Sequence, residues 1–428
     1  MSPDLLRIRQ DGELHEADTI ARLARRLTED LAPFAGCRVA LASARVRDIV
    51  ATMIACQSIG CELLLLRDSL PDDSSLWAHW DVAARFDDAL AIRPLPSARR
   101  LDTGFHLVLT TSGTTGQPKA ARHSLDRLLG RIRPPKSGAT DAVWLLTYHP
   151  ASFAGMQVLL TALVSGGTLA ACTHATVPDL ARVALDARPT HISGTPTFWR
   201  GFLLALGGRA AELPLKQVTL GGETVDQATL DRISAVYPSA GIAHIYASTE
   251  AGALFAVRDG QAGFPAGWLG QVTDGIELRL NGDMLEVRSP RMMQGYLSGG
   301  PPSPVGDGEW LSTGDLVEVR ADRTLFMGRI DSVINVGGAK VFPEEVEAVL
   351  LECAGVAEAR VFGKSNPITG QLVVAEVVLS DSSLNVDATR ADIQRHARSR
   401  LPAFKVPRVL TVKDRIVVSA SGKKQRVQ

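Results

Sequence analysis

The segment 111–119 combines the residue types that bind a polyanion. It consists of Thr111, Ser112, Gly113, Thr114, Thr115, Gly116, Gln117, Pro118 and Lys119. Its glycines let backbone N–H groups converge on phosphate oxygens, its hydroxyls add neutral donors, and its lysine adds a compact positive charge. The lysine stands three residues after the second glycine, so the segment is not a Walker A loop. We therefore expect a phosphate-binding loop of another kind, with a plain turn after the apolar run 107–109 as the alternative.

Four later stretches hold polar residues that we expect in loops. Residues 245–250 end an apolar run with an aromatic ring, two hydroxyls and a carboxylate. Residues 310–316 place an acid in a glycine turn. Residues 328–341 join a segment with the alternating pattern of strands to a final segment in which strands and helices are mixed, and residues 421–426 hold two lysines. Open α/β sheets hold ligands at the carboxyl ends of their strands, so these stretches predict binding loops.

The elements that must position these loops follow from the hydrophobic pattern. Short apolar strands alternate with helical spacing, which predicts an α/β fold with doubly wound mixed sheets in a large N-terminal domain, residues 1–328. Alternation around Asn281-Gly282-Asp283 predicts a hairpin, so residues from about 270 to 328 form a small antiparallel β unit. Residues 329–428 then predict a small, mobile α+β domain.

Length and composition limit the class of protein. A chain of 428 residues with 45% apolar and 21% charged residues is typical of a soluble protein of two or three domains. The 46 basic and 46 acidic residues balance, so we expect neither a nucleic acid nor a membrane as partner. Five scattered cysteines, the absence of a leader-like start and the absence of a spanning apolar stretch predict a cytoplasmic location.

Taken together and in order, the five motifs resemble those of the adenylate-forming superfamily, which comprises acyl- and aryl-CoA synthetases, nonribosomal adenylation domains and beetle luciferases. The resemblance runs from about residue 15 to the end of the chain. One such motif is a weak signal, whereas five in one order are a specific one.

The resemblance implies a site for ATP and AMP. Its residues would be Thr111, Ser112, Gly113, Thr114, Thr115, Gly116, Lys119, Gly221, Gly222, Glu223, Tyr246, Ser248, Thr249, Asp315 and Arg329. Tyr246 would stack on adenine, Thr249 would contact the α-phosphate, and Glu250 would hold Mg²⁺, a hard ion that suits a carboxylate. The alternative for Tyr246 is a core aromatic at a strand end.

The same resemblance assigns the remaining roles around the nucleotide. Residues 221–223 would line the adenine and acyl pockets, Asp315 would accept hydrogen bonds from both ribose hydroxyls, and Arg329 would contact ribose or phosphate. Lys423 would bridge the carboxylate and the α-phosphate and act in catalysis with Thr249 and Glu250. Lys424 competes for that role, but the Gly-Lys-x-x-Arg spacing to Arg426 selects Lys423.

Three further expectations concern the acid, the thiol and the domain movement. His149, Phe153 and Gly155 would line the acyl pocket, although a structural role for His149 is equally open. Gly337 and Gly338 would line the thiol tunnel. Asp331 would be the hinge about which the small domain turns.

These assignments predict ATP- and Mg²⁺-dependent activation of an aryl or compact carboxylic acid. The acyl group would pass to a thiol, with CoA favoured and the phosphopantetheine of an acyl carrier protein as the alternative. A non-catalytic nucleotide-binding homologue also stays open, because a fold alone does not prove an activity. The chain is short before the phosphate loop, so a further expectation is either a more open acyl pocket or a homodimer that covers it.

Overall fold

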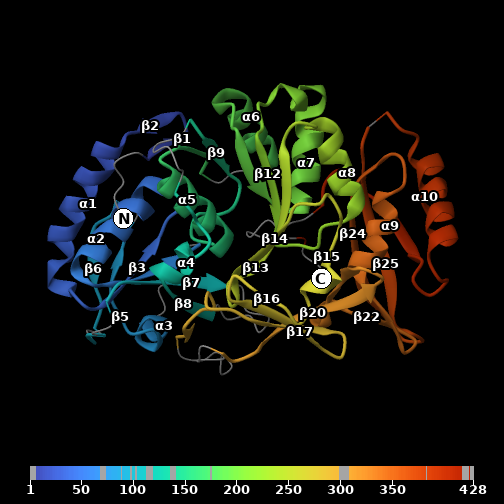
Figure 1. Ribbon diagram of the computed structural model, residues 1–428. Coiled ribbons are helices and arrows are strands. Elements are labelled where there is room, and N and C mark those ends of the chain that lie inside the picture. The colour runs from blue at the N-terminus through green and yellow to red at the C-terminus, as the bar shows by residue number, and fades with distance from the viewer. Residues whose placement is uncertain are drawn as a thin grey trace.

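The structure is a computed structural model of the chain. It describes residues 6–67, 74–87, 89–96, 99–101, 104–111, 119–134, 141–173, 176–297, 308–381, 383–416 and 424. Figure 1 shows how these residues are arranged, from the N-terminal elements in blue to the C-terminal elements in orange and red.

The first sheet carries Tyr246 and the glycines at 221–222. Its strand order is β14-β13-β12-β11-β9-β10-β1-β2. The strands are β1 Arg7–Gln10, β2 Glu13–His15, β9 Val143–Leu146, β10 Thr168–Ala171, β11 His191–Gly194, β12 Gln217–Gly221, β13 Gly241–Ser248 and β14 Gly252–Val257. Strands β1 and β9–β13 pair in parallel, so the carboxyl ends of β12 and β13 meet at one edge, and β2 and β14 close the ends antiparallel.

The helices beside this sheet begin at polar capping residues. They are α5 Phe153–Ser165, α6 Val177–Ala187, α7 Pro196–Leu206 and α8 Gln227–Val236. The side chains of Ser152, Thr176, Thr195 and Asp226 each accept a hydrogen bond from a backbone N–H of the first turn. These caps fix where each helix leaves its strand.

The second sheet carries both ends of the predicted phosphate loop. Its strand order is β19-β8-β7-β4-β3-β5-β6. The strands are β3 Arg38–Ala42, β4 Glu62–Leu66, β5 Val82–Phe86, β6 Ile92–Pro94, β7 His106–Thr111, β8 Lys119–Ser124 and β19 Gly295–Tyr296, and the associated helices are α1 Ala17–Leu31, α2 Val46–Ile59, α3 Ser74–His79 and α4 Leu125–Leu129.

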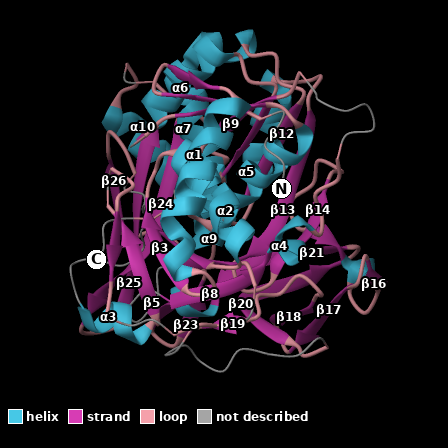
Figure 2. Cartoon of the chain, turned by 90° about the vertical axis from the view of Figure 1, so that its left-hand side faces the viewer, coloured by secondary structure: helices cyan, strands magenta, loops and turns pink. Residues whose placement is uncertain are grey.

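One apolar core joins these two sheets. It contains fully buried residues from β1, α1, α2, β7 and α5, namely Ile8, Leu27, Ile49, Leu107 and Leu159. Helices α1 and α2 lie side by side in Figure 2, where they cover one face of this core. Each fully buried leucine or isoleucine contributes about 1.5–3 kcal/mol relative to exposure, so this core holds the sheets in a fixed relation.

The third sheet is the predicted antiparallel β unit. Its strand order is β15-β21-β20-β18-β17-β16. The strands are β15 Phe264–Pro265, β16 Val272–Thr273, β17 Ile276–Asn281, β18 Met284–Arg288, β20 Leu311–Arg320 and β21 Arg323–Arg329. The predicted hairpin is confirmed by the pairing of Asn281 with Met284. Residues 311–315, expected in a loop, instead lie in β20, because the pairing with β18 and β21 continues on both sides of Gly314.

The C-terminal unit, defined here as residues 334–416 with Lys424, has a separate sheet and core. Its strands are β22 Ile334–Val336, β23 Ala339–Val341, β24 Val356–Asn366, β25 Gly370–Leu379 and β26 Val409–Val412, and its helices are α9 Pro343–Leu351 and α10 Val386–Arg400. In Figure 1 it lies on the right, beside α7 and α8. The boundary at residue 328 stays a prediction.

The α/β fold class predicted from the sequence is confirmed. The five cysteines are free thiols, and Cys37, Cys56 and Cys61 are buried. Among the described residues no helix is long and apolar enough to cross a membrane.

Candidate active site

Tyr246 and Asp315 bring the first and third sheets together. The Tyr246 ring, near the carboxyl end of β13, packs against Phe255 and Phe326 with centroid separations of 5.2 and 4.9 Å. Its hydroxyl donates a hydrogen bond to Oδ2 of Asp315 at 2.5 Å. Burial and the Asp315 carboxylate raise the pKa of Tyr246 well above its usual value, so the hydroxyl stays a donor. The predicted adenine-stacking ring therefore has core contacts and also touches the predicted ribose-binding acid.

Arg329 connects Asp315 to the predicted hinge. Strand pairing sets Asp315 opposite Arg329. The Nη1 of Arg329 lies 3.3 Å from Oδ1 of Asp315, and its Nε lies 3.3 Å from Oδ1 of Asp331. Gly314, at φ +78°, makes this approach possible, because an added Cβ would stand 2.8 Å from the Nη2 of Arg329. Asp315, Arg329 and Asp331 therefore form one charged cluster.

Tyr296 links the predicted magnesium ligand to the predicted phosphate-binding lysine. The hydroxyl of Tyr296 donates to Oε1 of Glu250 at 2.7 Å, and the Nζ of Lys119 lies 5.6 Å from the Tyr296 ring centroid. Antiparallel pairing of β19 with β8 puts Tyr296 opposite Ala121 and so places it there. Tyr296 was not predicted as a site residue from the sequence. A glycine and an aromatic ring after a hairpin were the only local signal.

The residues near Glu250 fit a magnesium ion that is carried by a nucleotide. Mg²⁺ usually binds through one or two carboxylates together with phosphate oxygens and water. Glu250 is half-buried and has one oxygen engaged by Tyr296, which leaves further acceptor capacity. Among the described residues no group of three or more His, Cys, Asp or Glu could hold a metal. The preceding Thr249 is half-buried, and the Oγ of Ser248 caps the turn by accepting from the N–H of Ala251 at 2.9 Å.

The predicted phosphate loop connects two paired strands. Thr111 ends β7, Lys119 begins β8, and the two residues stand opposite each other in the antiparallel register. The intervening loop residues Ser112, Gly113, Thr114, Thr115 and Gly116 lie outside the described residues. Both ends of the loop are therefore held on the sheet that also carries Tyr296.

Glu223 connects the end of β12 to two other segments. Gly222 has φ +84°, which turns the chain after β12. Oε2 of Glu223 accepts hydrogen bonds from the backbone N and Oγ1 of Thr197 at 3.1 and 2.7 Å. Its Oε1 accepts from the backbone N of Lys424 at 3.1 Å. Nearby, the hydroxyl of Tyr148 donates to the carbonyl of Gly221 at 3.4 Å, and burial raises the pKa of Tyr148.

The two candidate lysines differ in their placement. The Nζ of Lys424 lies 2.6 Å from Oε2 of Glu347, and the side chains are 5% and 6% exposed. Such an engaged ammonium group cannot also reach a substrate, which argues against Lys424 as the catalytic amine. Lys423 lies outside the described residues, so its role stays a prediction based on spacing.

The C-terminal unit contacts α7 and α8 of the preceding sheet. The Nη2 of Arg232 donates to the carbonyl of Val356 at 3.2 Å. Glu358 of β24 lies so close to α7 that a Cβ added to Gly201 would be 3.0 Å from its Oε1. Burial raises the pKa of Glu358, although Arg200 lowers it. These contacts place the C-terminal unit next to the Glu223 edge of the site.

The predicted acyl-pocket residues meet at the start of α5. A Cβ added to Gly155 would stand 2.1 Å from the carbonyl oxygen of His149, so this position requires glycine. Nδ1 of His149 lies 3.2 Å from the backbone N of Ala151. Phe153 is 7% exposed and lies 5.7 Å from the His123 ring, whose pKa burial lowers to about 3. The structure therefore gives Gly155 and Phe153 packing roles, while lining an acyl pocket stays a prediction for all three.

The predicted thiol-tunnel glycines lie apart from these contacts. Gly337 and Gly338 form the exposed turn between β22 and β23, with φ +57° and +87°. An added Cβ at either position would meet no described atom within 4 Å. Their tunnel role therefore needs another placement of the C-terminal unit and stays a prediction.

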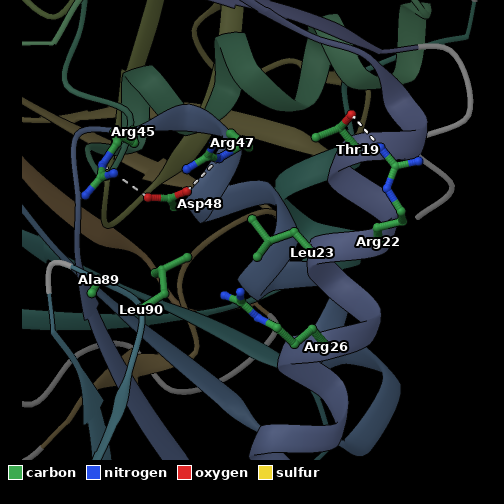
Figure 3. Close-up of a pocket in the computed structure, with 9 residues that line it drawn as sticks. All are labelled: Thr19, Arg22, Leu23, Arg26, Arg45, Arg47, Asp48, Ala89 and Leu90. Atoms are coloured by element: carbon green, nitrogen blue, oxygen red, sulfur yellow. Dashed lines mark hydrogen bonds and ion pairs between the residues drawn. The ribbon is translucent and has the colours of Figure 1, made fainter.

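A separate cavity of about 490 Å³ opens between α1 and the start of α2 (Figure 3). Its lining includes Arg22, Arg26, Arg45 and Arg47, and none of the predicted site residues. The buried Asp48 carboxylate lies 3.3 Å from the Nε of Arg45 and 2.9 Å from the Nε of Arg47. Two of these four arginines, Arg45 and Arg47, therefore form ion pairs with Asp48 within the protein.

Two protein-family profiles match the chain. The profile of the AMP-binding enzyme matches residues 93–297, and that of the AMP-binding enzyme C-terminal domain matches residues 345–423. Together they cover the phosphate loop, the Tyr246–Glu250 segment and residues 345–416 of the C-terminal unit.

Several characterised proteins are similar to this chain. The p-hydroxybenzoic acid–AMP ligase of Mycobacterium tuberculosis is 29% identical, and the match covers 96% of this chain and 63% of that protein. The 4-chlorobenzoate–CoA ligase of a Pseudomonas species is 30% identical over 78% of this chain and 66% of its own length. Among solved structures, an anthranilate CoA ligase with bound anthranoyl-AMP superposes with a TM-score of 0.78 at 18% identity, covering 97% of this chain and 92% of the other. The o-succinylbenzoate CoA synthetase of Bacillus subtilis gives a TM-score of 0.74 at 20% identity, covering 99% and 95%.

Proposed function

Since the chain belongs to the adenylate-forming superfamily, we propose that it activates a carboxylic acid with ATP and Mg²⁺ and then transfers the acyl group to a thiol. In the first step a carboxylate oxygen attacks the α-phosphorus of ATP, the bond to the bridging oxygen of the β-phosphate breaks, and pyrophosphate leaves. In the second step the thiol sulfur attacks the acyl carbon, the bond to the AMP oxygen breaks, AMP leaves and the thiol proton is released.

One observation carries this proposal. Two hydrogen-bonded groups lie close together along the chain: Tyr246, near the end of β13, bonds to Asp315, and Glu250, in the turn after β13, bonds to Tyr296. The first group suits a nucleoside and the second suits phosphates with Mg²⁺. A nucleoside joined to phosphates needs both kinds of group in one site.

The residues of this chain supply distinct contributions to the adenylation step. Asp315 would accept the ribose hydroxyls, and Lys119 would face the phosphates that leave as pyrophosphate. A bound Mg²⁺ ion at Glu250 would offset negative charge on the phosphate oxygens. Lys423 would hold the attacking carboxylate near the α-phosphate and offset the charge that develops there.

The proposed acid is aromatic or compact. The segment 148–155 contains no aspartate or glutamate that could hold an α-ammonium group. Its Phe153 belongs to the apolar core between the first two sheets, so the environment at this segment is apolar. The names of the similar ligases refer to hydroxybenzoate, chlorobenzoate and anthranilate, which supports an aryl acid.

The proposed thiol is CoA, and a carrier-bound phosphopantetheine is the alternative. Similar proteins include both CoA ligases and subunits of a peptide synthase, plipastatin synthase of Bacillus subtilis. The chain spans 63% of the length of the p-hydroxybenzoic acid–AMP ligase. Measuring thioester formation with CoA and with a phosphopantetheinylated carrier separates the two, and reaction with the carrier alone would refute CoA.

The test of the first step is acid-dependent exchange of pyrophosphate into ATP. The panel contains benzoate, 4-hydroxybenzoate, 4-chlorobenzoate, anthranilate and short aliphatic acids. We expect exchange with at least one aryl acid, and its loss in Lys423→Ala with retained ATP binding. Retained ATP binding without exchange for any acid would instead indicate a non-catalytic homologue.

A further inference from the structure

The side chain of Lys424 is buried and attaches the residue to the C-terminal unit. The Nζ of Lys424 lies 2.6 Å from Oε2 of Glu347 on α9. Oε1 of the same carboxylate accepts a hydrogen bond from the backbone N of Val361 on β24 at 2.9 Å. A charge pair this well buried needs such additional hydrogen bonds to be stable, and it fixes the position of the lysine within the unit.

The backbone of the same residue is attached to the other side of the site. The N–H of Lys424 donates to Oε1 of Glu223, whose Oε2 is held by Thr197 at the start of α7. The contacts of Arg232 and Glu358 described above join the C-terminal unit to α7 and α8 at the same place. Lys424 is therefore held from two sides, by α9 through its side chain and by Glu223 through its backbone.

We propose that Lys424 is a positioning residue for the adenylation step, and this inference rests on the proposed function. Lys423 precedes Lys424 directly in the chain, so anchoring Lys424 limits where the Lys423 ammonium group can reach. The pair with Glu347 lies within the C-terminal unit and moves with it. The contact with Glu223 lies between the two parts and must break when the unit turns for thiol transfer.

Because the side chain of Lys424 contacts Glu347 and its backbone contacts Glu223, loss of the side chain should affect one half-reaction more than the other. Loss of the Lys424 side chain releases the segment that carries Lys423, and it does not touch the nucleotide. A misplacement of about 1 Å in a reacting group can lower the rate about 100-fold. Adenylation should therefore slow, while ATP binding and thiol transfer from a supplied acyl-adenylate continue.

The experiment compares Lys424→Met with a matched control, Lys405→Met. Lys405 also pairs with a glutamate of α9, Glu345, at 2.7 Å, but it lies outside the C-terminal segment. We expect Lys424→Met to lower the kcat of pyrophosphate exchange about 10- to 100-fold. The KM for ATP and the rate of thioester formation from synthetic acyl-adenylate should stay within about twofold, and Lys405→Met should leave all three unchanged. Lys424→Arg, which keeps the charge, should recover part of the exchange rate.

Three outcomes would overturn the inference. One is an unchanged exchange rate in Lys424→Met. The others are an equal loss in both half-reactions and an equal loss in both lysine variants, either of which would indicate a general structural role. If Lys424→Met does not fold, Glu347→Gln keeps the hydrogen-bonding shape of the partner and should show the same split between the half-reactions.

A second readout does not depend on activity. Hydrogen exchange followed by mass spectrometry reports whether the amide of Lys424 is protected. We expect protection in the wild type and faster exchange in Lys424→Met, with no change in peptides from α1. Absence of exchange activity in the wild type would refute the proposed function, whereas an unprotected Lys424 amide in the wild type would refute the positioning role.

Discussion

The hydroxyl of Tyr246 donates a hydrogen bond to the carboxylate of Asp315 at 2.5 Å, across two sheets of the protein. Asp315 should accept the ribose hydroxyls with its remaining capacity. A hydrogen bond to a charged group contributes about 1.5–3 kcal/mol, so Asp315→Ala should weaken ATP binding about 10- to 100-fold. Tyr246→Phe keeps the ring and loses one donor, so it should cost at most about 10-fold. Titration calorimetry with ATP measures both, and an equal loss in the two variants would contradict the assignment to Asp315.

The hydrogen bond between Tyr296 and Glu250 predicts a change in magnesium requirement. Glu250→Gln removes the charge that attracts Mg²⁺ and should raise the half-saturating Mg²⁺ concentration for pyrophosphate exchange about 10-fold or more. Tyr296→Phe leaves the charge and removes only an orienting donor, so its effect should be smaller. Tyr237→Phe is the control, because the Tyr237 hydroxyl is buried and has no hydrogen-bond partner among the described residues. A magnesium requirement that Glu250→Gln leaves unchanged would exclude Glu250 as the ligand.

Burial of Glu358 predicts a contribution of stability that depends on pH. Burial raises the pKa of Glu358 above its ordinary value of 4.5, despite the opposing charges of Arg200 and Lys424. The folded protein therefore binds this proton more tightly than the unfolded chain does. The stability from this proton is complete below pH 4.5 and is lost as the pH rises through the raised pKa.

Glu358→Gln should remove this dependence. A raised carboxyl pKa acts between about pH 5 and pH 8. As the pH rises through this range, the Tm of the variant should increase relative to the Tm of the wild type. Thermal unfolding at matched ionic strength measures the difference between the two proteins at each pH. A constant difference across the range would show that Glu358 does not titrate there.

The close packing of Gly155 at the start of α5 predicts that a larger residue there destabilises the protein. Gly155→Ala would put a Cβ 2.1 Å from the backbone oxygen of His149, which cannot move without shifting the helix. We expect a loss of about 1–3 kcal/mol in the free energy of unfolding, as for other overpacked sites. Gly208→Ala is the control, because nothing described lies within 4 Å of its added Cβ. Denaturant unfolding compares the two, and an equal effect at both positions would contradict the packing role of Gly155.

Local patterns were enough to predict much of the fold. The strand before α5, β9, is a continuous apolar run, and the turn at Asn281-Gly282-Asp283 has hairpin chemistry, so apolar pattern and turn type identify these elements. Strand β1, in contrast, reads Arg-Ile-Arg-Gln and was not predicted. It pairs with β10 about 160 residues away, and such a pairing leaves no local signal.

The same distinction applies to the site. Asp315, Arg329 and Glu250 were predicted as site residues because motifs mark them, and the structure brings Asp315 and Arg329 into contact. Tyr296 and Glu347 were missed, because each reaches its partner through a long-range pairing of elements. Sequence spacing distinguished Lys423 from Lys424, but only the fold shows that Lys424 is occupied by Glu347.

Arg329 has one guanidinium group and shares it between Asp315 and Asp331. A turn of the chain at Asp331, the proposed hinge, would change the ion pair of Arg329 with Asp315. A nucleotide bound at Asp315 would in turn change the ion pair of Arg329 with Asp331. Thermodynamic linkage makes the two effects equal: the factor by which nucleotide shifts the hinge equilibrium is the factor by which the hinge shifts nucleotide affinity. Under the proposed function, this one side chain would couple the proposed hinge at Asp331 to the occupancy of the nucleotide site at Asp315.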